Sequence, residues 1–433
     1  MSASIENYYY GALLGQAAYG DYRSVNFGEN GYGIDEEVND VLTSSGEGGA
    51  NFTDKQAEDF QDNFEFVLGS HDPGTGFRAA LFFDKTTSEY TLAIGGTDPS
   101  EILGDVTFAD LVGIAATGYA SGQIAAMFAF YDELLATGIL HTDLRINVVG
   151  HSLGGHLATV FSIYRPLAVN HVYTYNGAGT GADDVGAARL QLDEILGNRE
   201  DSLAGGTYEN DRVTNLYAEA GPELTSGLGV LYGSTQPVYI EDNGALDNHS
   251  IQLLSESLAV YNLFDKLQTG ISVETVSGIL SATSPVISEQ SSLEAALDSL
   301  GSLFGQTLIW SDGDEAQHRD DLFRNAASLE ALIAPFGGNL QVTSLAQTDA
   351  ATLLALANPE SGGAEEFRYA IQELNPFAVG GEPALYANTS AESHLDWNAF
   401  SLDYWYDRSS LLEWKIRSNT DDPALRGLGV SSY

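Results

Sequence analysis

Hydrophobic positions in the first 270 residues form short runs that alternate with longer stretches of helical spacing. Residues 77–83 (FRAALFF) and 90–94 (YTLAI) are apolar runs separated by turn residues, which predicts two neighbouring strands in a hairpin-like arrangement. Residues 120–137 have apolar side chains at intervals of three and four, which predicts a helix. The run LRINVV at 144–149 predicts the strand that follows.

The same alternation continues to about residue 267. The pattern predicts helices at 155–164, 185–196 and 250–267, and strands at 171–175, 212–217 and 237–240. Strands that alternate with helices along a chain favour a mostly parallel sheet flanked by helices. The hydrophobic pattern therefore predicts an α/β fold.

The N-terminal segment combines one predicted helix with a long polar stretch. Residues 5–18 have helical spacing, and the residues from there to about 51 are rich in Gly, Asp, Glu and Ser, which is typical of a long surface loop. We interpret residues 23–70 and 98–120 as candidate mobile segments.

Beyond residue 270 the sequence changes to Leu- and Ala-rich segments of helical spacing, such as SSLEAALDSLGSLFG and TDAATLLALANPE. The chain has 433 residues, which is more than one hydrophobic core usually organises. We therefore predict an α/β domain over residues 1–268 and a mainly helical C-terminal domain, with no assigned role, over residues 269–433.

Composition narrows the class of protein. Hydrophobic residues make up 43% of the chain, enough for a packed core. The formal net charge of −44 excludes nucleic acid as a partner, because such a surface repels phosphate backbones. The chain has no cysteine, so disulfides, thiolate metal sites and cysteine nucleophiles are excluded. No stretch approaches 18 consecutive apolar residues, so we expect no transmembrane segment.

The pentapeptide GHSLG at 150–154 matches the G-x-S-x-G pattern of a nucleophile elbow. The pattern by itself arises readily by chance in a chain with 47 glycines, but here a β-branched run enters it and a predicted helix leaves it. That strand, turn and helix would present the hydroxyl of Ser152 to a substrate. The backbone N–H of Leu153, at the start of the helix, would stabilise an oxyanion.

A serine nucleophile needs a base and an acid that orients it. Of the eight histidines, His249 lies in the loop after the last predicted strand, so we predict it as the base, with His318 and His394 as alternatives. We set His151 and His156 aside because they lie on the elbow and its helix.

The acid is expected between Ser152 and His249, at the end of a strand. Glu219 follows the predicted strand at 212–217 and is our choice. Glu223, Asp211 and Asp183 are the alternatives, and for each of these residues the non-catalytic alternative is a solvated surface charge.

We place the second oxyanion donor at Thr97, in the turn that follows the strand at 90–94.

These segments together resemble the class 3 lipase family. The stretch IGGT at 94–97 and the stretch VVGHSLGG at 148–155 are similar to the family's oxyanion segment and elbow. The resemblance is nearest to bacterial lipases and phospholipases A1 exported by type I systems, and it implies an α/β-hydrolase fold, a Ser-acid-His triad and roles for Thr97, Ser152 and His249. The family's arginine before the glycine is replaced here by Gly95 and its aspartate by Glu219, and its calcium-binding repeats do not occur within these 433 residues.

The N-terminus has no basic region followed by an apolar run, so it is not a Sec signal peptide. With the resemblance, this leads us to expect a secreted bacterial protein exported without a Sec signal, with a cytoplasmic location as the alternative.

The segment SDGDE at 311–315 offers Asp312, Asp314 and Glu315 for a structural calcium ion, and the alternative interpretation is a solvated turn.

We therefore predict a serine ester hydrolase that acts on lipid acyl esters at a lipid–water interface, as a triacylglycerol lipase or phospholipase A1, and requires no organic cofactor. The alternatives are a short-chain or polyester esterase, and a non-catalytic binding module on a hydrolase scaffold.

Overall fold

The structure is a computed structural model, and it describes residues 4–46, 49–96, 120–197, 206–219, 229–241, 247–283, 291–311, 313, 315–387 and 395–420. Residue contacts divide the chain into two compact units. The first contains residues 7–255, and the second contains residues 256–433 together with residues 4–6. The predicted division after residue 268 stays a prediction.

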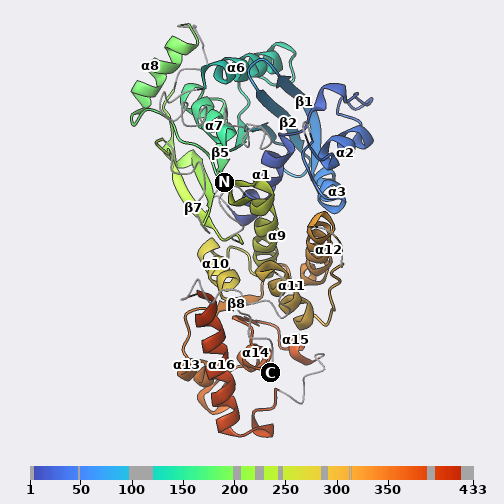
Figure 1. The fold of residues 1–433 in the computed structure, drawn as a ribbon, viewed down its shortest axis with the longest axis vertical. Helices are drawn as coiled ribbons and strands as arrows, with labels where there is room; N and C mark the ends of the chain where they lie inside the picture. The colour runs from blue at the N-terminus through green and yellow to red at the C-terminus, as the bar shows by residue number, and fades with distance from the viewer. Residues whose placement is uncertain are drawn as a thin grey trace. The chain divides into compact units, whose positions relative to one another are not determined.

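A seven-stranded sheet organises the first unit (Figure 1). Its strands lie in sequence order: β1 (Phe64–Asp72), β2 (Phe77–Asp84), β3 (Tyr90–Ile94), β4 (Ile146–His151), β5 (Val169–Tyr175), β6 (Val213–Ala218) and β7 (Ser234–Val238). The β1, β2 and β3 strands pair antiparallel, and every pair from β3 to β7 is parallel. The predicted mostly parallel sheet is confirmed, and so is the hairpin formed by β2 and β3.

Helices cover both faces of this sheet. The first unit contains α1 (Ile5–Ala17) from its third residue on, α2 (Asp35–Thr43), α3 (Asp54–Asn63), α6 (Ser121–Ala136), α7 (Leu153–Tyr164), α8 (Val185–Ile195), the start of α9 (Ile251–Leu267) and short 3₁₀ turns at Tyr22–Ser24, Asn210–Arg212 and Asp247–His249. Adjacent strand residues point to opposite faces. Val148 accordingly lies in the core formed with α6 and α7, whereas the side chain of Val149 faces Gly15 of α1.

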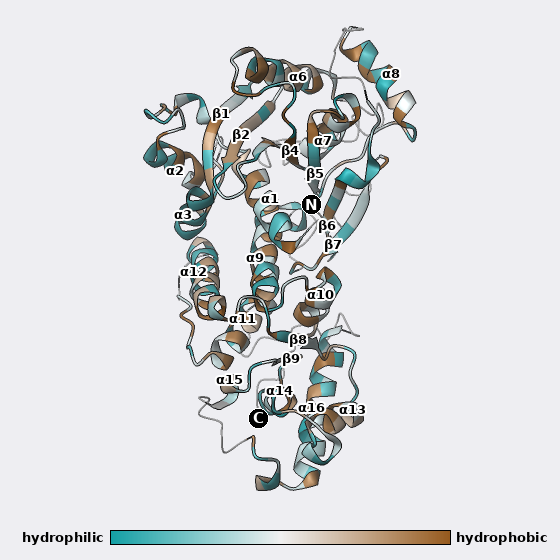
Figure 2. Ribbon diagram, turned by 180° about the vertical axis from the view of Figure 1, so that it is seen from behind, coloured by the Kyte–Doolittle hydropathy of each residue, from teal (hydrophilic) through white to brown (hydrophobic). Residues whose placement is uncertain are grey.

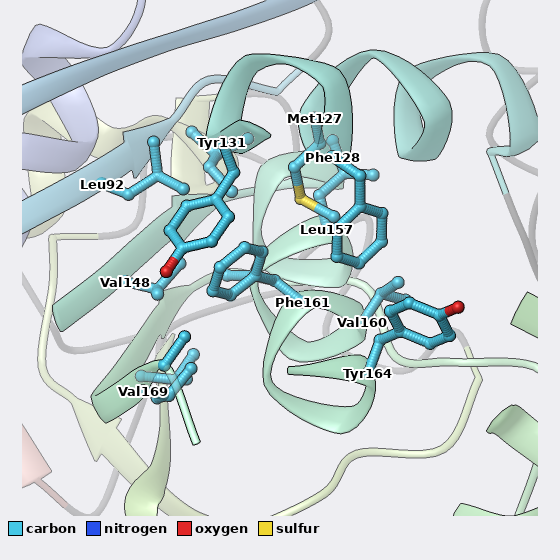
Figure 3. Packing of buried hydrophobic residues seen from close by; sticks show 14 of the residues in the cluster. Leu92, Met127, Phe128, Tyr131, Val148, Leu157, Val160, Phe161, Tyr164 and Val169 are labelled. Carbon is cyan, nitrogen blue, oxygen red and sulfur yellow. The ribbon is translucent and has the colours of Figure 1, made fainter. Parts of the chain in front are cut away.

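One cluster of buried residues lies between the sheet and the α6 and α7 helices. Phe128 and Tyr131 of α6 pack against Phe161 of α7, with ring centroids 5.7 and 4.9 Å apart. Leu92 of β3 and Val148 of β4 face these rings from the sheet (Figure 3). Because β4 and α7 are both packed into this core, the turn between them has a fixed position.

The N-terminal region differs from the predicted loop. Residues 35–43 and 54–63 form α2 and α3, and residues 64–72 form the edge strand β1. The sequence of α3 is polar, but the helix begins with a capping box in which Thr53 and Gln56 form reciprocal hydrogen bonds. The side chain of Phe60, within α3, is buried. The prediction of a long loop to residue 51 is therefore wrong over α2, and the prediction of a mobile segment over 23–70 stays a prediction. The other predicted mobile segment, 98–120, lies outside the described residues except for residue 120.

The second unit is mainly helical, as predicted. Its elements are the remainder of α9, α10 (Val273–Ala282), α11 (Ser292–Leu303), α12 (Glu315–Ile333), α13 (Ala350–Ala357), α14 (Glu365–Glu373), α15 (Ala384–Ala387), α16 (Leu402–Thr420), 3₁₀ turns at Ala334–Phe336, Pro359–Ser361 and Trp397–Ala399, and the antiparallel strands β8 (Gln341–Ser344) and β9 (Phe377–Gly380). The pair of strands was not predicted.

The two units both contain elements of mixed hydropathy and elements that are mainly hydrophobic. The β2 strand is coloured mainly as hydrophobic, whereas α12 has both hydrophilic and hydrophobic positions, as a helix with one buried side does (Figure 2). In the second unit a separate core gathers around Trp405, Leu412 and Ile416 of α16. Among the described residues, no helix is long and apolar enough to cross a membrane.

Candidate active site

Ser152 occupies a sharp turn between β4 and α7. Its backbone torsions are φ 56° and ψ −124°, in a region that residues other than glycine seldom adopt. Three hydrogen bonds hold the turn: the Ser152 N–H donates to the Tyr175 carbonyl at 3.0 Å, and the Ser152 carbonyl accepts from Gly155 at 3.0 Å and Ala178 at 3.1 Å. This is the strand, turn and helix of a nucleophile elbow.

The two glycines of the pentapeptide are required by close backbone contacts. A Cβ atom on Gly150 would lie 2.0 Å from the Gly154 carbonyl oxygen, and one on Gly154 would lie 2.2 Å from the Ile94 carbonyl oxygen. Neither contact has room for a methyl group, since the opposing atoms belong to the backbone. The glycines therefore let α7 approach the ends of β3 and β4.

His249 is the residue that the fold brings to Ser152. It ends the 3₁₀ turn Asp247–His249, and its Nε2 atom lies 2.9 Å from Ser152 Oγ. Both side chains are buried, with Ser152 at 0% exposure and His249 at 5%. A serine hydroxyl and an imidazole nitrogen at this distance can exchange a proton. Of the two alternatives, His318 lies on α12 in the second unit, 3.7 Å from Glu294, and His394 is outside the described residues.

His151 is the side chain whose part in the site the sequence analysis missed. It is 2% exposed, its Nε2 atom lies 2.8 Å from the carbonyl oxygen of His249, and its Nδ1 atom lies 2.6 Å from the Tyr19 hydroxyl. Setting His151 aside as a base agrees with this geometry, because its ring nitrogens face other groups than Ser152. The position of His151 directly before Ser152 in the sequence was the one sign that could have indicated its part in the site.

Asn176 is a second residue that the sequence analysis missed. It follows β5 directly and adopts a left-handed φ of 44°. Its side-chain amide donates to the carbonyls of Asn248 at 3.1 Å and His249 at 3.2 Å, and its Oδ1 atom accepts from the Ala218 N–H at 2.9 Å. An Asn-Gly pair directly after a strand is a turn signal, and it was the available sign of this special backbone position.

The structure describes three of the four candidate acids. Glu219 directly follows the strand, its side chain is exposed, and its backbone N–H donates to Val238 at 2.9 Å. Asp211 is at the opposite, amino-terminal end of β6, and Asp183 is exposed ahead of α8. Glu223 lies outside the described residues. The role of Glu219 therefore stays a prediction.

Of the two predicted oxyanion donors, the structure describes Leu153. Leu153 is the first residue of α7, and the first N–H groups of a helix have no partner within the helix. Thr97 lies outside the described residues, which end at Gly96 on this side. A Cβ atom on Gly96 would lie 2.9 Å from Ser152 Cβ and 2.8 Å from the Tyr19 hydroxyl, so the end of the β3 segment passes directly beside the serine.

The calcium prediction remains untested. Asp312 and Asp314 lie outside the described residues, and Glu315 is the exposed first residue of α12. Within the part of the chain that the structure describes, no three His, Asp or Glu side chains are grouped so that they could hold a metal ion.

The parallel sheet, the flanking helices and the serine elbow at the carboxyl end of β4 define a protein with the α/β-hydrolase fold. The sequence matches no protein-family model, and no curated protein matches it.

Solved structures similar to part of the chain include the Lip2 lipase from Yarrowia lipolytica, at 16% identity and a TM-score of 0.33 over 55% of this chain and 78% of that one. A nonglycosylated form of the same enzyme gives 15% and 0.32 over 56% and 82%, and a triacylglycerol lipase from Penicillium expansum gives 12% and 0.28 over 55% and 82%. Because these scores are low, the fold assignment depends on the sheet and elbow of this chain. The narrower resemblance to bacterial type I exported lipases stays a prediction.

Proposed function

We propose that this protein is a serine carboxylic-ester hydrolase. The single observation behind the proposal is the 2.9 Å approach of His249 Nε2 to Ser152 Oγ, with the serine in the strained turn of an elbow. A hydroxyl in this turn is activated by the adjacent base and is oriented away from its own backbone. A serine without a catalytic role would require neither the strained turn nor the adjacent imidazole.

Hydrolysis proceeds in two steps. Ser152 Oγ attacks the ester carbonyl carbon while His249 Nε2 takes the hydroxyl proton. The imidazolium then protonates the departing alcohol, which leaves an acyl group bonded to Ser152. Water attacks this acyl-enzyme with His249 again as the base, the free carboxylic acid leaves, and the proton returns to the serine. No organic cofactor takes part.

Three further groups complete the proposed site. Leu153 donates its backbone N–H to the oxyanion from the start of α7, and Thr97 donates a second hydrogen bond. Glu219 orients the imidazole of His249 and stabilises its charged form. The position of Glu219 after β6 supports this choice, because β6 and the elbow end at the same edge of a parallel sheet.

The proposed substrate is a lipid acyl ester, either a triacylglycerol or the acyl ester of a phospholipid. The support is the resemblance of the IGGT and VVGHSLGG segments to class 3 lipases. Ser152 is fully buried, so an ester can reach it only after the site opens. A lipid–water interface is the setting in which we expect that opening. The second candidate function is that of a short-chain or polyester esterase. The structural calcium site at residues 312–315 is a separate proposal.

Covalent labelling and product analysis test the function. A fluorophosphonate is expected to modify wild-type protein at Ser152 and to leave Ser152→Ala unmodified, as identified by peptide mass spectrometry. Wild type, beside Ser152→Ala, is then incubated with mixed phospholipid and triacylglycerol, and we expect free fatty acid only from wild type. Folded wild-type protein that is not labelled would instead favour a binding module on a hydrolase scaffold.

A further inference from the structure

We propose that Asn176 and His151 are positioning residues that hold the base of the reaction through its own backbone. Both donate hydrogen bonds to the carbonyl oxygen of His249, at 3.2 Å from Asn176 Nδ2 and 2.8 Å from His151 Nε2. The inference depends on the proposed function, since it assigns these two residues a part in placing His249 against Ser152.

The hydrogen-bonding chemistry of His151 fixes its tautomer. A carbonyl oxygen only accepts, so the Nε2 atom that faces His249 must carry a hydrogen. In the neutral ring Nδ1 is then an acceptor, and the Tyr19 hydroxyl 2.6 Å away is its donor. Tyr19 is 7% exposed, so this pair lies away from water. The Tyr19 hydroxyl, which can donate, therefore complements the tautomer of His151 that the His249 carbonyl requires.

The orientation of the Asn176 amide follows from the same kind of argument. The Ala218 N–H donates to one side-chain atom at 2.9 Å, which must be the oxygen, so the NH₂ group faces the carbonyls of Asn248 and His249. Its two hydrogens match these two acceptors. Asn176 also donates its backbone N–H to Leu216 at 2.9 Å. The residue therefore ties the end of β6 to the turn that holds the base.

The turn needs such support because it is short. Asp247–His249 is a single 3₁₀ turn, and the last carbonyls of a helix have no partner within it. The ring of His249 is attached to this backbone, so a shift of the turn moves Nε2 relative to Ser152 Oγ. A misplacement of about 1 Å in a catalytic pair can slow a reaction about 100-fold.

The first test compares two matched asparagine variants. Asn215 is also buried, and its amide likewise donates to two backbone carbonyls, those of Tyr232 and Ser234, away from the serine. Asn176→Asp and Asn215→Asp each replace an NH₂ group with an oxygen that repels these carbonyls. We expect fluorophosphonate labelling of Ser152, measured on folded protein, to be slowed about 10- to 100-fold in N176D and less than about 3-fold in N215D. Equal slowing in the two variants would overturn the proposal.

The second test concerns His151, and its first measurement, the tautomer of the ring, does not depend on activity. In protein labelled with ¹⁵N-histidine, with the His151 signals assigned by their loss in His151→Gln, we expect a neutral ring protonated at Nε2. Protonation at Nδ1 instead contradicts the inference. For labelling of Ser152 we expect His151→Gln, which retains an N–H donor, to react faster than His151→Phe, which has none. Equal rates in these two variants also contradict it.

The outcomes separate the two proposals. Wild-type protein that is folded but neither labelled nor active contradicts the proposed function and, with it, the positioning role that depends on that function. Wild-type protein that is labelled, with unchanged rates in N176D and His151→Phe, contradicts the positioning role and leaves the proposed function in place.

Discussion

The Nε2 atom of His249 lies 2.9 Å from the Oγ atom of Ser152, although 97 residues separate them in the sequence. The serine is held by the packing of β4 and α7, and the histidine by hydrogen bonds to its backbone carbonyl from His151 and Asn176. Two separate parts of the first unit therefore determine this one distance.

Removing either member of the pair is expected to abolish ester hydrolysis. Ser152→Ala and His249→Gln should each lower kcat by about 10⁴-fold or more, because the nucleophile and its base act as a unit. The measurement is steady-state kinetics on a chromogenic ester. His141→Gln is the control, since His141 is exposed, and it should retain wild-type kcat. A double variant that is far slower than either single variant would contradict action as a unit.

The acid of the triad can be identified by amide substitution. Glu219→Gln is expected to lower kcat by about 10³- to 10⁴-fold, because the amide no longer stabilises the charged imidazole. Glu223→Gln and Asp211→Asn should leave kcat within about 3-fold of wild type. The comparison is made at pH values where wild type is fully active. If Glu223→Gln is the damaging change, the acid is Glu223 and our choice is wrong.

Two helical glycines are expected to respond oppositely to alanine. Gly278 of α10 has room for a methyl group, the nearest atom being 3.7 Å away, so Gly278→Ala should raise the free energy of unfolding by about 0.5–1 kcal/mol. Gly154 of α7 faces the Ile94 carbonyl at 2.2 Å, so Gly154→Ala should lower it by about 3 kcal/mol or more and prevent labelling of Ser152. Chemical denaturation measures both. A stabilised Gly154→Ala would disprove the packing argument.

Stability is expected to fall in mild acid because of His156. Burial lowers the pKa of His156 from its ordinary 6.5 to about 4, so the unfolded chain binds a proton that the folded protein does not bind between these pH values. The stabilisation is complete above pH 6.5 and is lost as the pH falls toward 4, by about 3 kcal/mol at full effect.

The comparison that isolates this effect is His156→Asn. Its amide nitrogen replaces Nδ1, which donates to the Gly179 carbonyl at 2.9 Å, and it does not titrate. Urea unfolding at several pH values gives the free energy of unfolding of each protein. The value for wild type minus the value for the variant should fall by about 3 kcal/mol from pH 7 to pH 4. A constant difference would show that His156 does not contribute to the pH dependence.

Access to the buried serine is expected to depend on an interface. Ser152 is 0% exposed, so fluorophosphonate labelling should be slow in buffer and at least about 10-fold faster with phospholipid vesicles or triacylglycerol emulsion. A short-chain monomeric ester below its solubility limit should give little of this increase. Highest activity on acetyl esters, with no response to lipid, would refute the lipid substrate and favour the short-chain esterase.

The sequence predicted the sheet apart from its edge strand β1, because the signals of the other strands are local. Runs such as 144–149 and 171–175 are apolar and bounded by turn residues, and they became β4 and β5. Residues 35–43 were predicted as part of a loop because the stretch to about residue 51 is polar, but they form α2. No helix was predicted over residues 54–63, because α3 depends on the Thr53 capping box and on burial of Phe60, which composition does not reveal.

The sequence by itself determined the elbow, since the GHSLG pentapeptide between a strand and a helix specifies both the turn and the serine at its tip. It also indicated His249, through the order of residues after the last strand. Only the tertiary structure brought His151, Tyr19 and Asn176 to the backbone of His249. Hydrogen bonds between side chains and distant carbonyls leave no periodic trace along a chain, because they depend on where the ends of neighbouring strands meet.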